Sequence, residues 1–133
     1  MLSICAVFLS LTGIYAQSKA DSTTCSRVKD GVYKIISPTA EGKNIEYLIT
    51  RKGDTQTEYI KDFGLKLEFT VTWTDPCTYV LSKPRVVEGQ SSALDEEMEV
   101  TVHIIAITAK LYKAKVTSNL YEAEEEMDIF SVK

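Results

Sequence analysis

The sequence is poor in the residues on which common active sites depend. Its 133 residues include one histidine, three cysteines and six scattered glycines. It has no glycine-rich loop of the kind that binds phosphates, no G-x-S-x-G motif and no H-E-x-x-H motif. The usual catalytic machinery is therefore missing, and we expect a protein that is not an enzyme and that has no metal site and no cofactor.

The chain also lacks a large net charge of either sign. Fifteen Lys and Arg residues and nineteen Asp and Glu residues give a net charge of −4. Proteins that bind nucleic acids usually concentrate basic residues on one surface, so this composition argues against a nucleic-acid partner. Apolar residues make up 44% of the chain, which is typical of one globular domain with one core.

The longest apolar run lies at the start of the chain. Residues 2–16 contain no charged side chain, and the run has the length of a signal-peptide core but is too short to span a membrane. We expect residues 1–16 to be a signal peptide and residues 17–24 to be a flexible linker, with cleavage after Ala16 or after Ala20. The rival interpretation is a first core strand or helix. No later run is apolar enough for a membrane helix, so the predicted location is periplasmic or extracellular.

Two cysteines remain after such a cleavage, Cys25 and Cys77. In an oxidising compartment an even pair predicts one disulfide. A redox or metal-binding pair is the alternative, but the sequence has no C-x-x-C motif, and one histidine cannot complete a tetrahedral site with two cysteines. We therefore expect Cys25 and Cys77 to be joined.

From residue 31 onward, apolar side chains recur at every second position, which is the period of a β-strand. The clearest example runs from Leu65 to Trp73, where five apolar residues alternate with Lys, Glu and Thr. A half-buried strand separates these two sets onto its two faces, whereas a helix would scatter them. The same pattern predicts strands at residues 32–36, 44–51, 55–60, 77–82, 98–107, 111–117 and 127–132.

The connections between these segments are mostly short. The sequence from Arg51 to Asp54 and the turn at Pro76 are predicted tight reversals, residues 37–43 and 84–95 are looser loops, and residues 91–97 could form a short helix. No segment could provide the helical crossover that parallel strands require. We therefore predict an all-β fold over residues 25–133, a small antiparallel up-and-down β-barrel of about eight strands that leaves no exposed edges.

Three spaced motifs are similar to those of known proteins. They are Cys25-x5-Gly31-x-Tyr33, Arg51-x4-Gln56-x-Glu58 and Val71-x-Trp73-x3-Cys77-x-Tyr79-x-Leu81. Together they resemble small exported proteins of Bacteroidetes-type bacteria, which implies a bacterial exported protein with the Cys25–Cys77 pairing but no particular activity. More distantly, the Gly-Val-Tyr opening is similar to the Gly-x-Trp signature of lipocalin-like barrels, with Tyr in place of Trp. Such barrels hold apolar ligands, so this resemblance implies a barrel that could bind one.

Acidic residues cluster at residues 95–99 and 122–128, but neither cluster has the spacing of a calcium-binding loop. Paired carboxylates could also hydrolyse glycosides. We expect solvated side chains and cross-strand partners instead, with Lys113 and Lys115 facing Glu124 and Glu126. The one histidine, His103, is expected on the surface or the barrel lining rather than as a catalytic base.

Six aromatic residues fall mostly on the predicted inner faces of the strands, where they could line a cavity or fill the barrel. As ligand-binding candidates they are Tyr33, Tyr47, Phe69, Trp73, Tyr79 and Tyr112. We therefore predict an exported, non-enzymatic protein that binds a small apolar or amphipathic ligand inside a β-barrel. The alternative is an envelope module with a filled core and no small-molecule ligand, which binds another protein through a sheet face or a strand edge.

Overall fold

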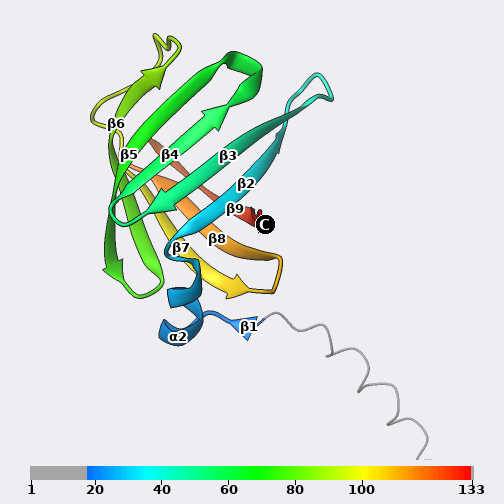
Figure 1. Cartoon of the computed structure of the whole chain (residues 1–133), viewed down its shortest axis with the longest axis vertical. Helices are drawn as coiled ribbons and strands as arrows, with labels where there is room; N and C mark the ends of the chain where they lie inside the picture. Colours follow the sequence, from blue (N-terminus) through cyan, green and yellow to red (C-terminus); the bar gives the residue numbers. More distant parts are fainter. Residues whose placement is uncertain (1–17, 133) are drawn as a thin grey trace, which may run out of the picture.

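Eight antiparallel strands form a closed barrel in the computed structural model, which describes residues 18–132 (Figure 1). The strands are β2 (Gly31–Pro38), β3 (Asn44–Lys52), β4 (Thr55–Ile60), β5 (Leu65–Asp75), β6 (Thr78–Glu88), β7 (Val100–Ile107), β8 (Leu111–Ser118) and β9 (Tyr121–Ser131). Each strand pairs with its neighbours in sequence, and β9 pairs with β2 to close the sheet. The predicted all-β up-and-down barrel is confirmed.

A short N-terminal segment lies at one end of the barrel (Figure 1). It comprises β1 (Ser18–Lys19), which pairs with β7, the helix α2 (Ser22–Cys25) and the 3-10 helix η2 (Ser26–Val28). The Asp21 side chain caps α2 by accepting hydrogen bonds from the backbone N–H groups of Thr23 and Thr24. Part of the segment expected to be a linker thus contains defined elements, whereas the predicted signal peptide, residues 1–16, lies outside the described residues.

The expected disulfide fastens this segment to the barrel. Cys25 and Cys77 are bonded, with their Cα atoms 5.3 Å apart, and Cys25 is completely buried. Val28 in η2 is also part of the hydrophobic core. The N-terminal segment is therefore packed against the barrel as well as covalently attached to it. Within residues 18–132, no helix has the length and hydropathy needed to cross a membrane.

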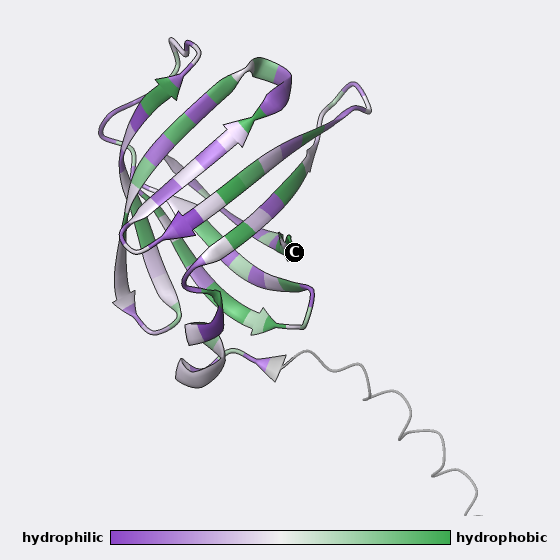
Figure 2. Cartoon of the chain, in the orientation of Figure 1, coloured by the Kyte–Doolittle hydropathy of each residue, from purple (hydrophilic) through white to green (hydrophobic). Residues whose placement is uncertain are grey.

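Alternation of apolar and polar side chains produces the core (Figure 2). Along β5, Leu65, Leu67, Phe69 and Val71 are buried, while the residues between them are only half-buried. Burying one large apolar side chain contributes about 1.5–3 kcal/mol, so a strand with four inward apolar residues is held firmly in its register.

Two strands are longer than the sequence predicts by more than three residues. β6 continues beyond residue 82 to Glu88, because a bulge at Lys83, with φ of 52°, lets Pro84 enter the sheet and be buried. β9 begins at Tyr121 rather than Met127. Its first residues carry charge on both faces, since their inward side chains face a hollow rather than a packed core, so the apolar alternation that marks a strand is weak there.

The connections at the far end of the barrel from α2 are irregular. Residues 61–63 form the 3-10 helix η3 (Lys61–Phe63). Residues 91–97, which could have formed a short helix, contain only bends and a turn. The Asp95 carboxylate accepts the backbone N–H of Glu97 and thereby favours that turn. Asn119, after β8, bonds both Glu97 and Glu99, which anchors the 89–99 loop beside the barrel mouth.

Candidate functional site

The barrel contains a cavity of about 880 Å³. Its wall is mainly apolar, and the aliphatic and aromatic residues that line it include Ile35, Tyr47, Ile49, Phe69, Leu81, Val100, Val102, Val116 and Met127. Cavities that hold one small molecule have volumes of about 300–1,000 Å³ and walls of this kind. Both the size and the chemistry of the cavity therefore suit a small apolar or amphipathic molecule.

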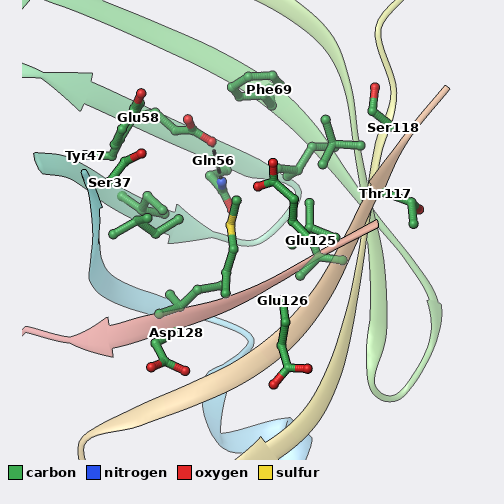
Figure 3. Close-up of a pocket in the computed structure, with 18 of the residues that line it drawn as sticks. Ser37, Tyr47, Gln56, Glu58, Phe69, Thr117, Ser118, Glu125, Glu126 and Asp128 are labelled. Carbon is green, nitrogen blue, oxygen red and sulfur yellow. Dashed lines mark hydrogen bonds between the residues drawn. The ribbon is translucent and has the colours of Figure 1, made fainter. Parts of the chain in front are cut away.

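Glu58 is an ionisable group on the cavity wall (Figure 3). It lies on the inward face of β4, between Ile49 of β3 and Leu67 of β5. Its Oε2 accepts a hydrogen bond of 3.0 Å from Nε2 of Gln56, and no other hydrogen bond to its side chain is found within residues 18–132. Burial raises the pKa of the Glu58 carboxyl above its ordinary value, although Gln56 and the charge of Arg51 act in the opposite direction.

The other acidic residues of the cavity come from β9. Figure 3 shows Glu125 pointing into the barrel, whereas Glu126 and Asp128 lie on the other side of the strand from Gln56 and Glu58. Asp128 is held outside by a 2.7 Å bond from the Lys113 ammonium. No Lys, Arg or His is among the cavity-lining residues of the described chain, and the cation of Arg51 is hydrogen-bonded to Gln56 behind the lining.

Below the cavity, Arg51 fills the barrel interior near the end covered by α2. Its side chain points inward from β3 and is only 1% exposed. All five of its N–H groups donate hydrogen bonds of 2.7–3.1 Å. The acceptors are the carbonyl oxygens of Val28 and Lys29, the side-chain oxygen of Gln56 and the hydroxyls of Tyr79 and Tyr112.

Aromatic rings surround the Arg51 guanidinium. Its carbon lies 4.5 Å from the ring centre of Tyr79, 5.0 Å from that of Tyr33 and 6.0 Å from that of Tyr112. Burial disfavours the cation, but the tyrosine side chains outweigh that effect and raise the pKa of Arg51. For the Tyr79 hydroxyl, burial itself raises the pKa well above its ordinary value. No carboxylate forms a salt bridge with Arg51 in the described residues, so hydrogen bonds and aromatic faces take the place of a counter-ion.

The Gly-x-Tyr opening of β2 has a structural role in this cluster. Gly31 has φ of 141°, a conformation that side chains rarely permit, and a Cβ at this position would lie 2.8 Å from the Tyr33 hydroxyl. That hydroxyl donates a 2.8 Å hydrogen bond to the carbonyl of Asp30. A glycine two residues before the tyrosine thus lets the ring fold back under the barrel, beside Arg51.

The six predicted aromatic residues do not form one group in the structure. Tyr47, Phe69 and Tyr79 line the cavity, and Tyr79 also packs on Arg51. Tyr33 and Tyr112 belong to the cluster around Arg51, and Trp73 packs against Tyr79, with ring centres 4.8 Å apart, outside the cavity lining. That any of these residues contacts a ligand stays a prediction.

Sequence reasoning missed the roles of Arg51, Gln56 and Glu58. The sequence predicts Arg51 as the last residue of a strand and the first of a hairpin turn, whereas β3 extends to Lys52 and the turn is Gly53 and Asp54. A signal was available, because Arg51 is in phase with the inward residues Ile49 and Tyr47. A charged residue at an inward position of a strand demands a buried network of partners.

The acidic clusters and the histidine lie mostly on the outer surface. Lys113 pairs with Asp128 rather than with Glu124 or Glu126, because the register of β8 and β9 places these two residues opposite each other. Lys115 does lie opposite Glu126. His103 is exposed, with its Nδ1 2.7 Å from the Thr78 hydroxyl. Within residues 18–132, no three His, Cys, Asp or Glu side chains converge in a way that could hold a metal ion.

No protein-family model, curated protein or solved structure matches this chain. The barrel implied by the lipocalin-like opening is present. The relation to exported proteins of Bacteroidetes-type bacteria stays a prediction that rests on the spaced motifs alone.

We expect Glu58→Gln to stabilise the protein at neutral pH and to have little effect in acid. Because folding raises the pKa of this carboxyl, its favourable contribution is complete below the ordinary pKa of 4.5 and is lost as the pH rises through the folded pKa. Glutamine keeps the size and the hydrogen-bond acceptor but cannot ionise. Urea unfolding at neutral and acidic pH measures the difference, and Glu124→Gln, on the exposed outer face of β9, is the control. A destabilisation by Glu58→Gln at neutral pH, or an effect of the same size at both pH values, would contradict the expectation.

Proposed function

We propose that this protein is an exported, non-enzymatic binding protein that takes a small apolar or amphipathic molecule into the barrel. The observation that carries the proposal is the 880 Å³ cavity with its mainly apolar wall. A barrel of eight strands can be filled by its own side chains, as the Arg51 cluster fills the lower half of this one. The side chains around the cavity lack van der Waals contacts on their inner side, and a bound apolar molecule would supply these contacts.

The proposed export is supported by the disulfide between Cys25 and Cys77. Such bonds form and persist in oxidising compartments and are rare where thiols are kept reduced. Together with the apolar run of residues 2–16, the bond favours the periplasm or the exterior of the cell.

Titration with the uncharged fluorescent probe N-phenylnaphthylamine tests the cavity. We expect saturable binding of one molecule per protein, with a Kd on the order of 1–10 µM, because burial of the probe's rings provides most of the free energy. Val116→Trp should abolish binding, since Val116 faces inward on β8 opposite Val102, and an indole there would occupy the cavity.

Lys115→Trp is the matched control, because Lys115 immediately precedes Val116 in β8 and its side chain is exposed. This variant should bind the probe as the unmodified protein does. Equal binding by the unmodified protein and both variants would mean that the probe lies outside the barrel, and the proposal would then fail.

One observation favours the alternative function of binding another protein. Val32, Ile36 and Leu48 lie on the outer faces of the neighbouring strands β2 and β3, and their exposures are 37%, 43% and 37%. Exposed apolar residues on adjacent strands can mark an interaction surface. The barrel has a cavity, so the protein-binding alternative no longer includes a filled core. Absence of probe binding would support this alternative.

A further inference from the structure

The cavity combines an apolar wall with a carboxylate that has a free hydrogen-bonding position. Glu58 accepts one hydrogen bond, from Gln56, through Oε2. Its Oε1 has no hydrogen-bond partner within residues 18–132, and it is not among the buried, unsatisfied atoms of the protein, so space lies beside it. Glu125 adds a second carboxylate toward the same space (Figure 3).

Arg51 is not available to bind an anionic ligand. Each of its N–H groups already donates to a protein acceptor, and it is absent from the cavity lining. Gln56 is largely committed, because its oxygen accepts from Arg51 and one of its two amide N–H groups donates to Glu58. Hydroxyl groups also line the cavity, but the carboxylates that face into it are those of Glu58 and Glu125, and Glu58 is the more buried of the two.

We propose that the cavity selects amphiphiles with a protonated amine, whose nitrogen donates a hydrogen bond to Oε1 of Glu58 while the apolar body lies along the cavity wall. This inference rests on the proposed function of the barrel as a ligand-binding protein. The nitrogen of such a ligand would form a charge-assisted bond, which is stronger than a bond between neutral groups.

Charge explains why the selection would be against fatty acids and other anionic amphiphiles. An anionic head group would meet Glu58 and Glu125 with no cation among the lining residues to pair with it, because Arg51 lies behind Gln56 and donates all its N–H groups to protein acceptors. An ammonium would instead supply the charge partner that the half-buried Glu58 lacks on its Oε1 side. Burial raises the pKa of this carboxyl, and pairing with a cation would offset that effect.

Calorimetric titration with three ligands that share one alkyl chain tests the inference. These ligands are dodecylamine, dodecanol and dodecanoate, each kept below the concentration at which it forms micelles. We expect dodecylamine to bind about tenfold or more tightly than dodecanol, and dodecanoate to bind more weakly than dodecanol. The comparison uses the unmodified protein, so it does not depend on any variant that must fold.

The variant Glu58→Gln identifies the recognition group. It should weaken dodecylamine binding about tenfold and change dodecanol binding by less than about twofold, because only the charge is removed. Glu124→Gln, with its exposed side chain on the outer face of β9, removes the same charge from the surface and should leave both affinities unchanged.

The outcomes separate the two proposals. If none of the three ligands binds, the proposed function fails. If dodecanol or dodecanoate binds as tightly as dodecylamine, the barrel binds ligands but the selection for amines is wrong. A preference for dodecylamine that survives in Glu58→Gln would also overturn the inference, because the amine would then be recognised elsewhere.

Discussion

Replacing Arg51 by methionine is expected to destabilise the protein by about 3–5 kcal/mol. Methionine can fill the space of the aliphatic stem, but it donates no hydrogen bond. The buried carbonyl oxygen of Val28 and the side-chain oxygen of Gln56 would each lose the 2.8 Å hydrogen bond that they accept from Arg51. The hydroxyls of Tyr79 and Tyr112 would lose the cation between them, although they still lie 2.9 Å from each other. Each unsatisfied buried group costs about 1–3 kcal/mol, so the sum is a large part of the stability of a small domain.

Urea unfolding measures this loss, and two further variants define its cause. Lys52→Met removes a positive charge from the next residue, which is exposed, and should change stability by less than about 0.5 kcal/mol. Arg51→Lys keeps the charge but offers three donors without the planar geometry, so it should also be strongly destabilising. A loss in Arg51→Met no larger than that in Lys52→Met would show that the hydrogen-bonded cluster does not hold the lower half of the barrel together.

Removing the disulfide is expected to cost about 4 kcal/mol of stability. Cys25 and Cys77 are 52 residues apart in sequence, and a cross-link that closes a loop of this length restricts the unfolded chain strongly. The N-terminal segment would then be held only by contacts such as that of Val28 with the core. We expect the double variant Cys25→Ala and Cys77→Ala to unfold at a correspondingly lower urea concentration.

Reductant provides the control for the disulfide. The unmodified protein in reductant should lose stability by the amount lost in the double variant, whereas the double variant should be insensitive to reductant. The cavity is lined by residues of the strands and by Met98 of the 89–99 loop, and not by the N-terminal segment, so the folded double variant should still bind the hydrophobic probe. Equal stability of the unmodified protein with and without reductant would contradict the predicted contribution.

The alternation of side chains was sufficient to predict the barrel where strands face a packed core. Residues 65–73 show this clearly, because inward Leu67 and Phe69 are buried and the residues between them are not. The prediction was weakest where the interior is hollow or the backbone is irregular. Glu125 could not mark a strand by hydrophobicity, and Pro84 suggested a break in the chain although a bulge accommodates it inside β6.

The candidate site was less predictable because it depends on register. Tyr47 and Phe69 line the cavity, whereas Tyr33 and Tyr112 pack on Arg51, and aromatic character alone does not distinguish these roles. Tyr79 lies at the boundary and does both. Position along the strand decides between these roles, since residues near the end covered by α2 join the Arg51 cluster. The inward phase of Glu58 could be read from its place two residues after Gln56, but the space beside it could not be inferred without coordinates.

A crystal structure of the purified protein grown with dodecylamine tests most directly whether the hollow half of the barrel holds an apolar guest. We predict electron density for the alkyl chain between Phe69 and Val116, with the amine nitrogen within hydrogen-bond distance of Glu58. Side chains of β4 and β9 packed against one another in place of the cavity, with dodecylamine bound only on the outer surface, would contradict the proposal.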